Sequence, residues 1–144
     1  MKIRYCFPPD IYEYVHEAMV NIANAAQVGD DLLWSHYREK LLEFCEQQTA
    51  VGRGSGFMWE ALADISDDSP ERLGYYERAL AFARTNGEPK HTILLEIGQI
   101  CIADRDWNRA QSLLIAAREE AIKFGDTESN EDAVSLLLRI TGNS

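Results

Sequence analysis

The sequence predicts an all-α fold, a short solenoid of about three antiparallel helical hairpins closed by a C-terminal capping helix. Apolar residues recur at helical spacing along most of the chain, and no convincing strand pattern is present. Two stretches also repeat one another. The first half of the repeat recurs after 35 residues, from Trp59, Leu62 and Ala63 to Leu94, Ile97 and Gly98. The second half recurs after 38, from Tyr76 and Ala79 to Leu114 and Ala117. Such a period is typical of stacked helical hairpins.

The first hairpin is predicted over residues 10–48. Pro8-Pro9-Asp10 marks a helix start with Asp10 as the cap, and Gly29 is placed to end this helix. Asp30-Asp31 caps the second helix, which we expect to end around Gln48.

The second hairpin is predicted over residues 57–87. Three glycines between Gly52 and Gly56 predict a flexible connector before it. Its first helix spans 57–65. Its second spans 71–85, with Ser69 as the cap and Pro70 at the first helical position.

The third hairpin is predicted over residues 91–125, with helices at 91–103 and 107–124. Ser129-x-x-Asp132 is similar to a capping box and opens a terminal helix over 129–141. A hairpin cannot bury its apolar stripe alone, so we expect this helix to cover the open end of the stack.

The stretch 91–125 resembles a tetratricopeptide repeat. The residues that carry the resemblance are Leu94, Ile97 and Gly98, the turn Arg105-Asp106-Trp107, and Ala110, Leu114 and Ala117. The stretch 57–87 resembles a degenerate copy in which Arg72 replaces a small residue, and 10–48 resembles a weaker one. The resemblance implies one domain over 1–144, a right-handed solenoid and a role in binding other proteins.

The net charge of −10 and the pI of about 4.7 restrict the partners. Lys and Arg are few and interleaved with acids, so neither nucleic acid nor an anionic membrane is an expected partner. An acidic surface can steer a basic protein, although acidity that serves solubility alone is equally compatible with the sequence. No apolar run is long enough to span a bilayer, and Pro8-Pro9 interrupts any signal peptide, which predicts a cytoplasmic protein.

The sequence offers little for chemistry, and we expect no cofactor. Cys6, Cys45 and Cys101 are widely spaced, which predicts buried thiols in a reducing compartment. Glu13-x-x-His16 and Glu88-x-x-His91 copy the spacing of di-iron bundles, but a solvated helix face explains them better. The glycines of the connector lack the Lys-Ser/Thr of a phosphate loop.

In the family that the chain resembles, the first helix of each hairpin lines a concave groove. Carried onto this sequence, with the first hairpin placed by spacing, the predicted partner-binding residues are Glu13, Glu17, Asn21, Phe57, Glu60, Asp64, Leu95 and Gln99. Four of these are carboxylates and would make one side of the groove acidic. The alternative is an ordinary hydrated helix face. Trp34 and Trp107 are either interface anchors or packing residues.

These observations favour a non-catalytic protein-binding module. Its most concrete form is a small immunity or antitoxin protein that neutralises a basic toxin. The alternative is an adaptor or assembly subunit that docks a peptide, and a metal-dependent helical-bundle enzyme comes third. The partner and the oligomeric state stay open.

Overall fold

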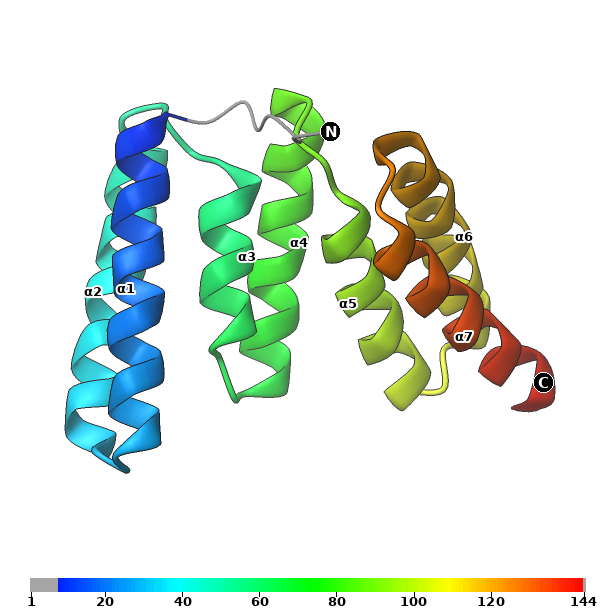
Figure 1. Cartoon of the computed structure of the whole chain (residues 1–144), viewed down its shortest axis with the longest axis horizontal. Coiled ribbons are helices and arrows are strands. Elements are labelled where there is room, and N and C mark those ends of the chain that lie inside the picture. The colour runs from blue at the N-terminus through cyan, green and yellow to red at the C-terminus, as the bar shows by residue number, and fades with distance from the viewer. Residues whose placement is uncertain (1–7, 144) are drawn as a thin grey trace. The chain divides into compact units, whose positions relative to one another are not determined.

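The computed structural model describes residues 8–143, and within that range the chain is helical, with seven helices and no strand (Figure 1). The predicted all-α fold is therefore confirmed. The helices are α1 (Pro9–Gln27), α2 (Asp31–Ala50), α3 (Gly56–Asp64), α4 (Ser69–Asn86), α5 (His91–Ala103), α6 (Trp107–Phe124) and α7 (Thr127–Asn143). None of them is long and apolar enough to cross a membrane.

The described chain divides into two compact units. The N-terminal unit, residues 8–82, contains α1, α2, α3 and most of α4. The C-terminal unit, residues 83–143, contains the end of α4 and α5 to α7.

In the N-terminal unit, α1 pairs with α2, and α3 packs against both. The core between them is fully buried and includes Ile11, Leu41 and Trp59. The Trp59 indole N–H at its edge is satisfied, because it donates to Thr49 Oγ1 at 3.1 Å. Burial raises the pKa of the Cys45 thiol to about 12, so this cysteine is an inert core residue, as its sequence context predicts.

In the C-terminal unit, α5 packs against both α6 and α7, and α6 packs against α7. The predicted small residues lie at these contacts. Gly98, Ala110 and Ala117 are all buried. A Cβ atom on Gly98 would lie only 2.8 Å from Leu114 Cδ2, so a glycine is what lets α5 approach α6 this closely.

Several helix ends agree with the sequence. The Asp30 carboxylate accepts the backbone N–H of Leu33 at 3.0 Å and caps α2. Gly29 and Gly125 adopt left-handed backbone conformations, with φ of 70° and 72°; Gly29 follows Val28, the C-cap of α1, and Gly125 is the C-cap of α6. The bounds of α5 and α6 are the predicted ones.

Three predicted caps are wrong. The N-cap of α1 is Pro8 and not Asp10; Pro9 at the first helical position has no N–H to satisfy, and Asp10 instead pairs with Arg53 at 2.9 Å. Asp68, not Ser69, accepts the N–H of Glu71 and starts α4.

The third error concerns the terminal helix. It begins at Thr127 and runs to Asn143, because the Asp126 carboxylate, rather than Ser129, accepts the N–H at its start. In this helix, as in α4, a nearby aspartate is the better cap, because its negative charge also interacts favourably with the helix dipole.

The connector between α2 and α3 is exposed over residues 51–53 but packed at its end. Gly54 lies so close to Phe82 that a Cβ atom would approach the ring to 2.6 Å. Ser55 is buried and caps α3 by accepting the N–H of Met58 at 3.4 Å. Gly54 therefore serves close packing, whereas Gly52, with a φ of 80°, serves the turn.

We predict that Gly98→Leu destabilises the protein by about 1–3 kcal/mol or more, because the added side chain must displace the fully buried Leu114. Gly74→Ala is the matched control. Gly74 lies inside α4 with no atom within 4 Å of its would-be Cβ, so alanine should stabilise the helix by about 0.5–1 kcal/mol. Urea denaturation measures both effects. Equal stability of Gly98→Leu and the wild type would contradict the close contact.

Candidate functional site

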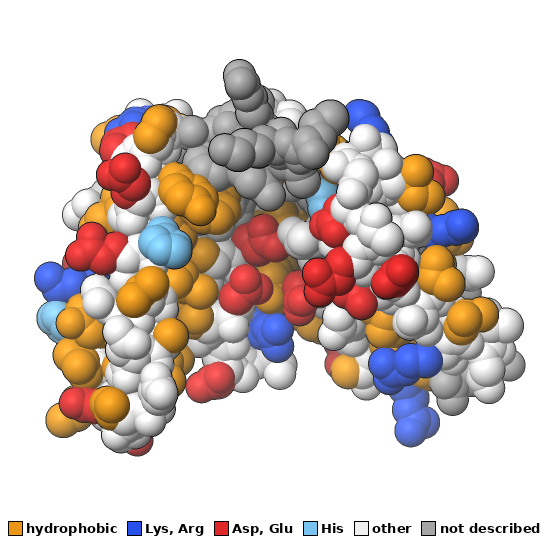
Figure 2. Space-filling view, in the orientation of Figure 1, with side chains coloured by type: hydrophobic (Ala, Val, Ile, Leu, Met, Phe, Trp, Pro, Cys, Tyr) orange, Lys and Arg blue, Asp and Glu red, His pale blue; other side chains and the backbone are white. Residues whose placement is uncertain are grey.

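The negative charge of the chain is concentrated in the N-terminal unit. Residues 8–82 contain 14 Asp and Glu but only 5 Lys and Arg, whereas residues 83–143 contain 10 and 7. The N-terminal unit therefore carries a formal charge of −9 and the C-terminal unit −3. Figure 2 shows acidic side chains interspersed with apolar ones over the face that carries α1.

Two of the predicted site residues form an exposed acidic pair on α1. Glu13 and Glu17 lie one helical turn apart, and neither makes a hydrogen bond or ion pair within residues 8–143. Asn21 follows one turn later and is half-buried. The three side chains thus form a polar row along α1 in which the two charges are open to a partner.

Aromatic rings join this part of α1 to α3. Tyr12 stacks on Phe57, with ring centroids 5.5 Å apart, and on His16 at 6.1 Å. Tyr12 is exposed and Phe57 half-buried, so the stack reaches the surface. The structure therefore brings Phe57 of α3 against Tyr12 of α1.

The two predicted carboxylates of α3 have different surroundings from those of α1. Glu60 is half-buried. Asp64 is exposed as a residue, yet its carboxylate lies against the buried Tyr76 and accepts the phenol O–H at 2.5 Å. Partial burial raises the pKa of Asp64, and the Tyr76 hydrogen bond and the Arg72 charge only partly offset this. Asp64 therefore has a structural role beyond any contact with a partner.

The two remaining predicted residues belong to the C-terminal unit. On α5, Leu95 is buried at 6% exposure, while Gln99, one turn later, is exposed. Six of the eight predicted residues thus lie in the N-terminal unit and two in the other.

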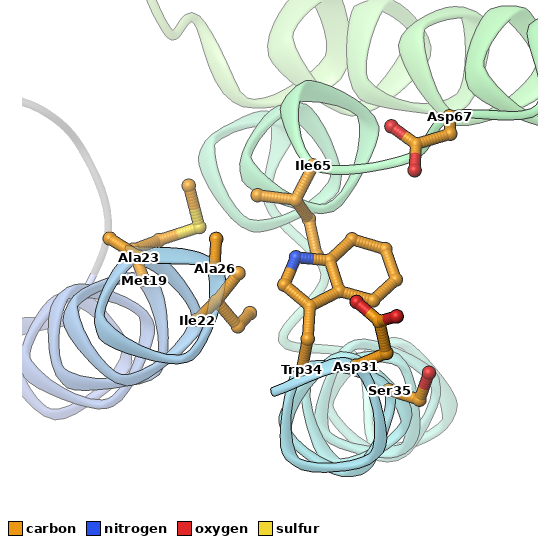
Figure 3. A pocket seen from close by; sticks show the side chains of 9 residues that line it. All are labelled: Met19, Ile22, Ala23, Ala26, Asp31, Trp34, Ser35, Ile65 and Asp67. Atoms are coloured by element: carbon orange, nitrogen blue, oxygen red, sulfur yellow. The ribbon is translucent and has the colours of Figure 1, made fainter. Parts of the chain in front are cut away.

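An open cleft in the N-terminal unit, with a volume of about 680 Å³, was not predicted from the sequence (Figure 3). The side chains that line it are Met19, Ile22, Ala23 and Ala26 of α1, Asp31, Trp34 and Ser35 of α2, and Ile65 and Asp67 after α3. The Trp34 ring extends from α2 toward Ile65, beside the row on α1. Apolar spacing on α1 marks the row from Met19 to Ala26, but only the folded chain brings Ile65 and Asp67 opposite it.

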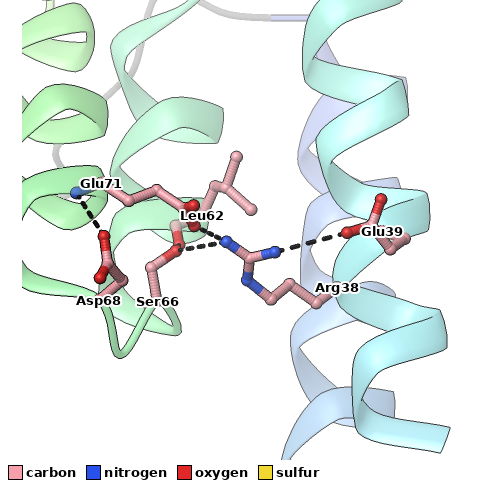
Figure 4. Close-up of polar contacts among 6 residues, drawn as sticks. All are labelled: Arg38, Glu39, Leu62, Ser66, Asp68 and Glu71. Carbon is pink, nitrogen blue, oxygen red and sulfur yellow. Dashed lines mark hydrogen bonds and ion pairs between the residues drawn. The ribbon is translucent and has the colours of Figure 1, made fainter. Parts of the chain in front are cut away.

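A cluster around Arg38 fixes the loop that forms one side of this cleft (Figure 4). The Arg38 guanidinium pairs with Glu71 and donates to Ser66 Oγ at 3.5 Å. The Ser66 hydroxyl in turn donates to the carbonyl of Leu62 at 2.7 Å. One half-buried cation of α2 thereby fastens the turn between α3 and α4 that carries Ile65 and Asp67.

In the C-terminal unit, His91 takes part in a hydrogen-bonded pair that the sequence did not reveal. Its Nε2 lies 2.9 Å from Asp126 Oδ2, and its Nδ1 is buried without a hydrogen-bond partner. In the neutral ring, Nε2 therefore carries the proton and donates to the carboxylate. Within residues 8–143 no three His, Cys, Asp or Glu side chains are grouped to hold a metal ion.

Comparisons with protein-family models, with curated proteins and with solved structures give no match for this chain. We therefore infer its function from the geometry and charge of its own residues.

We predict that Asp64→Lys destabilises the N-terminal unit by about 1–3 kcal/mol, because the buried Tyr76 hydroxyl loses its acceptor. Asp64→Asn is the matched control, since the amide oxygen can still accept this bond. Chemical denaturation followed by circular dichroism measures the difference. Equal losses in the two variants would mean that the hydrogen bond does not matter.

We predict that the C-terminal unit loses stability in acid because of Asp126. Burial raises its pKa, but hydrogen bonds from Ser129 and His91 outweigh this, and the net pKa lies below the usual value. A lowered pKa stabilises the fold above the unfolded value of about 4, and this stabilisation is lost as the pH falls through the folded value. Asp126→Ala should cost about 1 kcal/mol at pH 7 and less below about pH 4. A cost that is constant in thermal melts from neutral to acidic pH would contradict the assignment.

Proposed function

We propose that the protein is a non-catalytic binding module whose N-terminal unit binds a partner protein with a basic surface. The observation that carries the proposal is the charge of −9 on residues 8–82, displayed in part by the open carboxylates Glu13 and Glu17. Charges that have no partner inside the fold contribute little to stability, but they attract an oppositely charged protein and raise its rate of association.

Apolar and aromatic side chains beside these charges support the same function. Tyr12 and Val20 of α1 are both exposed, and Phe57 stacks on Tyr12. Electrostatic attraction sets the rate and orientation of docking, whereas buried aromatic contacts supply most of the affinity. A surface that offers both is suited to a specific complex.

The most concrete form of this proposal is an immunity or antitoxin protein that covers a basic toxin. An acidic helical chain is compatible with that role. We also propose that α5 and α6 pack in the manner of a tetratricopeptide-repeat hairpin, and the close contact of Gly98 with Leu114 supports this packing.

The experiment is affinity capture from the native host with the tagged full-length chain, followed by mass spectrometry. We expect a basic protein to be retained at low salt and released as the salt rises, because exposed charges are screened over about 10 Å at 0.1 M. Glu13→Lys combined with Glu17→Lys should weaken its binding at least about tenfold.

The matched control is Glu131→Lys combined with Asp132→Lys, which makes the same charge change on exposed positions of α7. If both double variants weaken binding equally, net charge alone matters and the α1 surface is not the site. Capture of an acidic partner, or binding that is insensitive to salt, would refute the proposal.

A further inference from the structure

We propose that the cleft around Trp34 is a docking site for a segment of a partner protein in which an apolar side chain is flanked by lysine or arginine. This inference rests on the proposed function and specifies where in the N-terminal unit the partner is anchored. It concerns a different surface from the Glu13 and Glu17 pair.

The floor of the cleft is apolar. Met19, Ile22 and Ala23 of α1 line one side of it, and the half-buried Trp34 ring extends from α2 toward Ile65 (Figure 3). A volume of about 680 Å³ is large enough for one or two bulky side chains. A tryptophan in such a position can stack on an inserted apolar group and exclude water from it.

The polar groups of the cleft are unsatisfied within the described chain and define the chemistry of the occupant. The Trp34 indole N–H has no hydrogen-bond acceptor among residues 8–143. Asp31 and Asp67 are exposed at the rim, and neither forms a hydrogen bond or ion pair there. The occupant should therefore offer an oxygen to the indole and cations to the two carboxylates.

Apolar side chains are also exposed at residues that adjoin Asp31 and Trp34 in the sequence. At the turn between α1 and α2, Leu32 is 87% exposed and Val28 is 75% exposed. Leu33 is exposed beside them. These residues adjoin the two cleft residues in the sequence, and exposed aliphatic side chains contribute to an interaction surface where they are contiguous.

Charge distinguishes between the candidate occupants. A second copy of this chain would bring a unit of charge −9 against another of the same sign, which opposes association. An anionic membrane is repelled for the same reason. A basic amphipathic segment satisfies both the apolar floor and the acidic rim, and it agrees with the basic partner already proposed.

The turn that carries Asp67 is held in place before any partner binds. Arg38 joins it to α2 through Ser66 and Glu71 (Figure 4). A site that is already formed loses little conformational entropy on binding, which favours affinity for a short segment.

The test uses the full-length chain and a synthetic peptide of about 14 residues, in which leucines follow one helical face and lysines fill the other positions. The readout is the indole N–H signal of Trp34 in a proton–nitrogen correlation spectrum, identified by its absence in Trp34→Phe. We expect the peptide to shift this signal at saturation more than those of Trp59 and Trp107. The same peptide with glutamate in place of lysine should not bind.

Two variants on different helices test the cleft, so that the conclusion does not depend on a single substitution. Trp34→Ala should weaken peptide binding about tenfold. Ala23→Gln places a polar chain across the floor from an exposed helical position that tolerates glutamine, and should weaken binding at least about fivefold. Trp107→Ala, a change in the C-terminal unit, is the control and should leave affinity within about twofold.

The outcomes separate this inference from the proposed function. The leucine–lysine peptide could bind in a salt-dependent way and leave the Trp34 signal unmoved, or Ala23→Gln and Trp34→Ala could both bind it like the wild type. Either result means that the cleft is not the site. The proposed function of the acidic surface would then stand without this inference. If the peptide shifts Trp34 equally at low and high salt, the cleft is a site for apolar groups, and both the acidic rim and the basic partner are refuted. Absence of peptide binding overturns the inference.

Discussion

Close packing of helices across small side chains is the constraint on which both units depend. Ala63 and Ala79 in the N-terminal unit, and Gly98 and Ala117 in the C-terminal unit, are all buried. Helices can approach closely only where such residues meet, and the large side chains beside them then fill the remaining space at the density of a protein interior. Because interiors of this density deform little, the surface residues that they support are held in fixed positions.

The N-terminal unit shows how that rigidity reaches the surface. Arg38 is only half-exposed, and removing a guanidinium partly from water is unfavourable unless its donors are used. Here Glu71 and Ser66 accept from it, so the turn between α3 and α4 is fastened to α2. The cleft around Trp34 exists because this turn is kept at a fixed place opposite α1. Its shape is thus a consequence of the polar cluster as much as of the apolar core.

Sequence reasoning succeeded where a signal was local. The bounds of α5 and α6 follow from clear breaks on either side, and the Asp30-Asp31 pair directly after Gly29 located the cap of α2, which Asp30 provides. It failed at α4 and α7, where several residues could serve as the cap and the choice depends on which carboxylate the folded backbone orients toward the first N–H groups.

The candidate sites also divide into those that a local sequence pattern marks and those that only the folded chain reveals. The acidic row of Glu13 and Glu17 could be found from helical spacing alone, because both residues lie on one element. The bond between Asp64 and Tyr76 and the pair of His91 with Asp126 join residues 12 and 35 positions apart, so no local pattern announces them. No single stretch of sequence could predict the cleft, because its lining residues come from α1, α2 and the turn after α3.

The two surfaces of the N-terminal unit suit successive stages of one association. Exposed carboxylates act over several ångströms and are weakened by salt, so they govern the approach and orientation of a basic protein. An apolar cleft acts only on contact, where it slows dissociation by removing an inserted side chain from water. Asp31 and Asp67 can take part in both stages, because they are exposed to solvent and also border the apolar floor of the cleft. A partner with charge alone would be attracted and released, whereas one that also carries an apolar side chain between its cations would be retained. In the binding mode that we propose, specificity comes from requiring both features within one short segment.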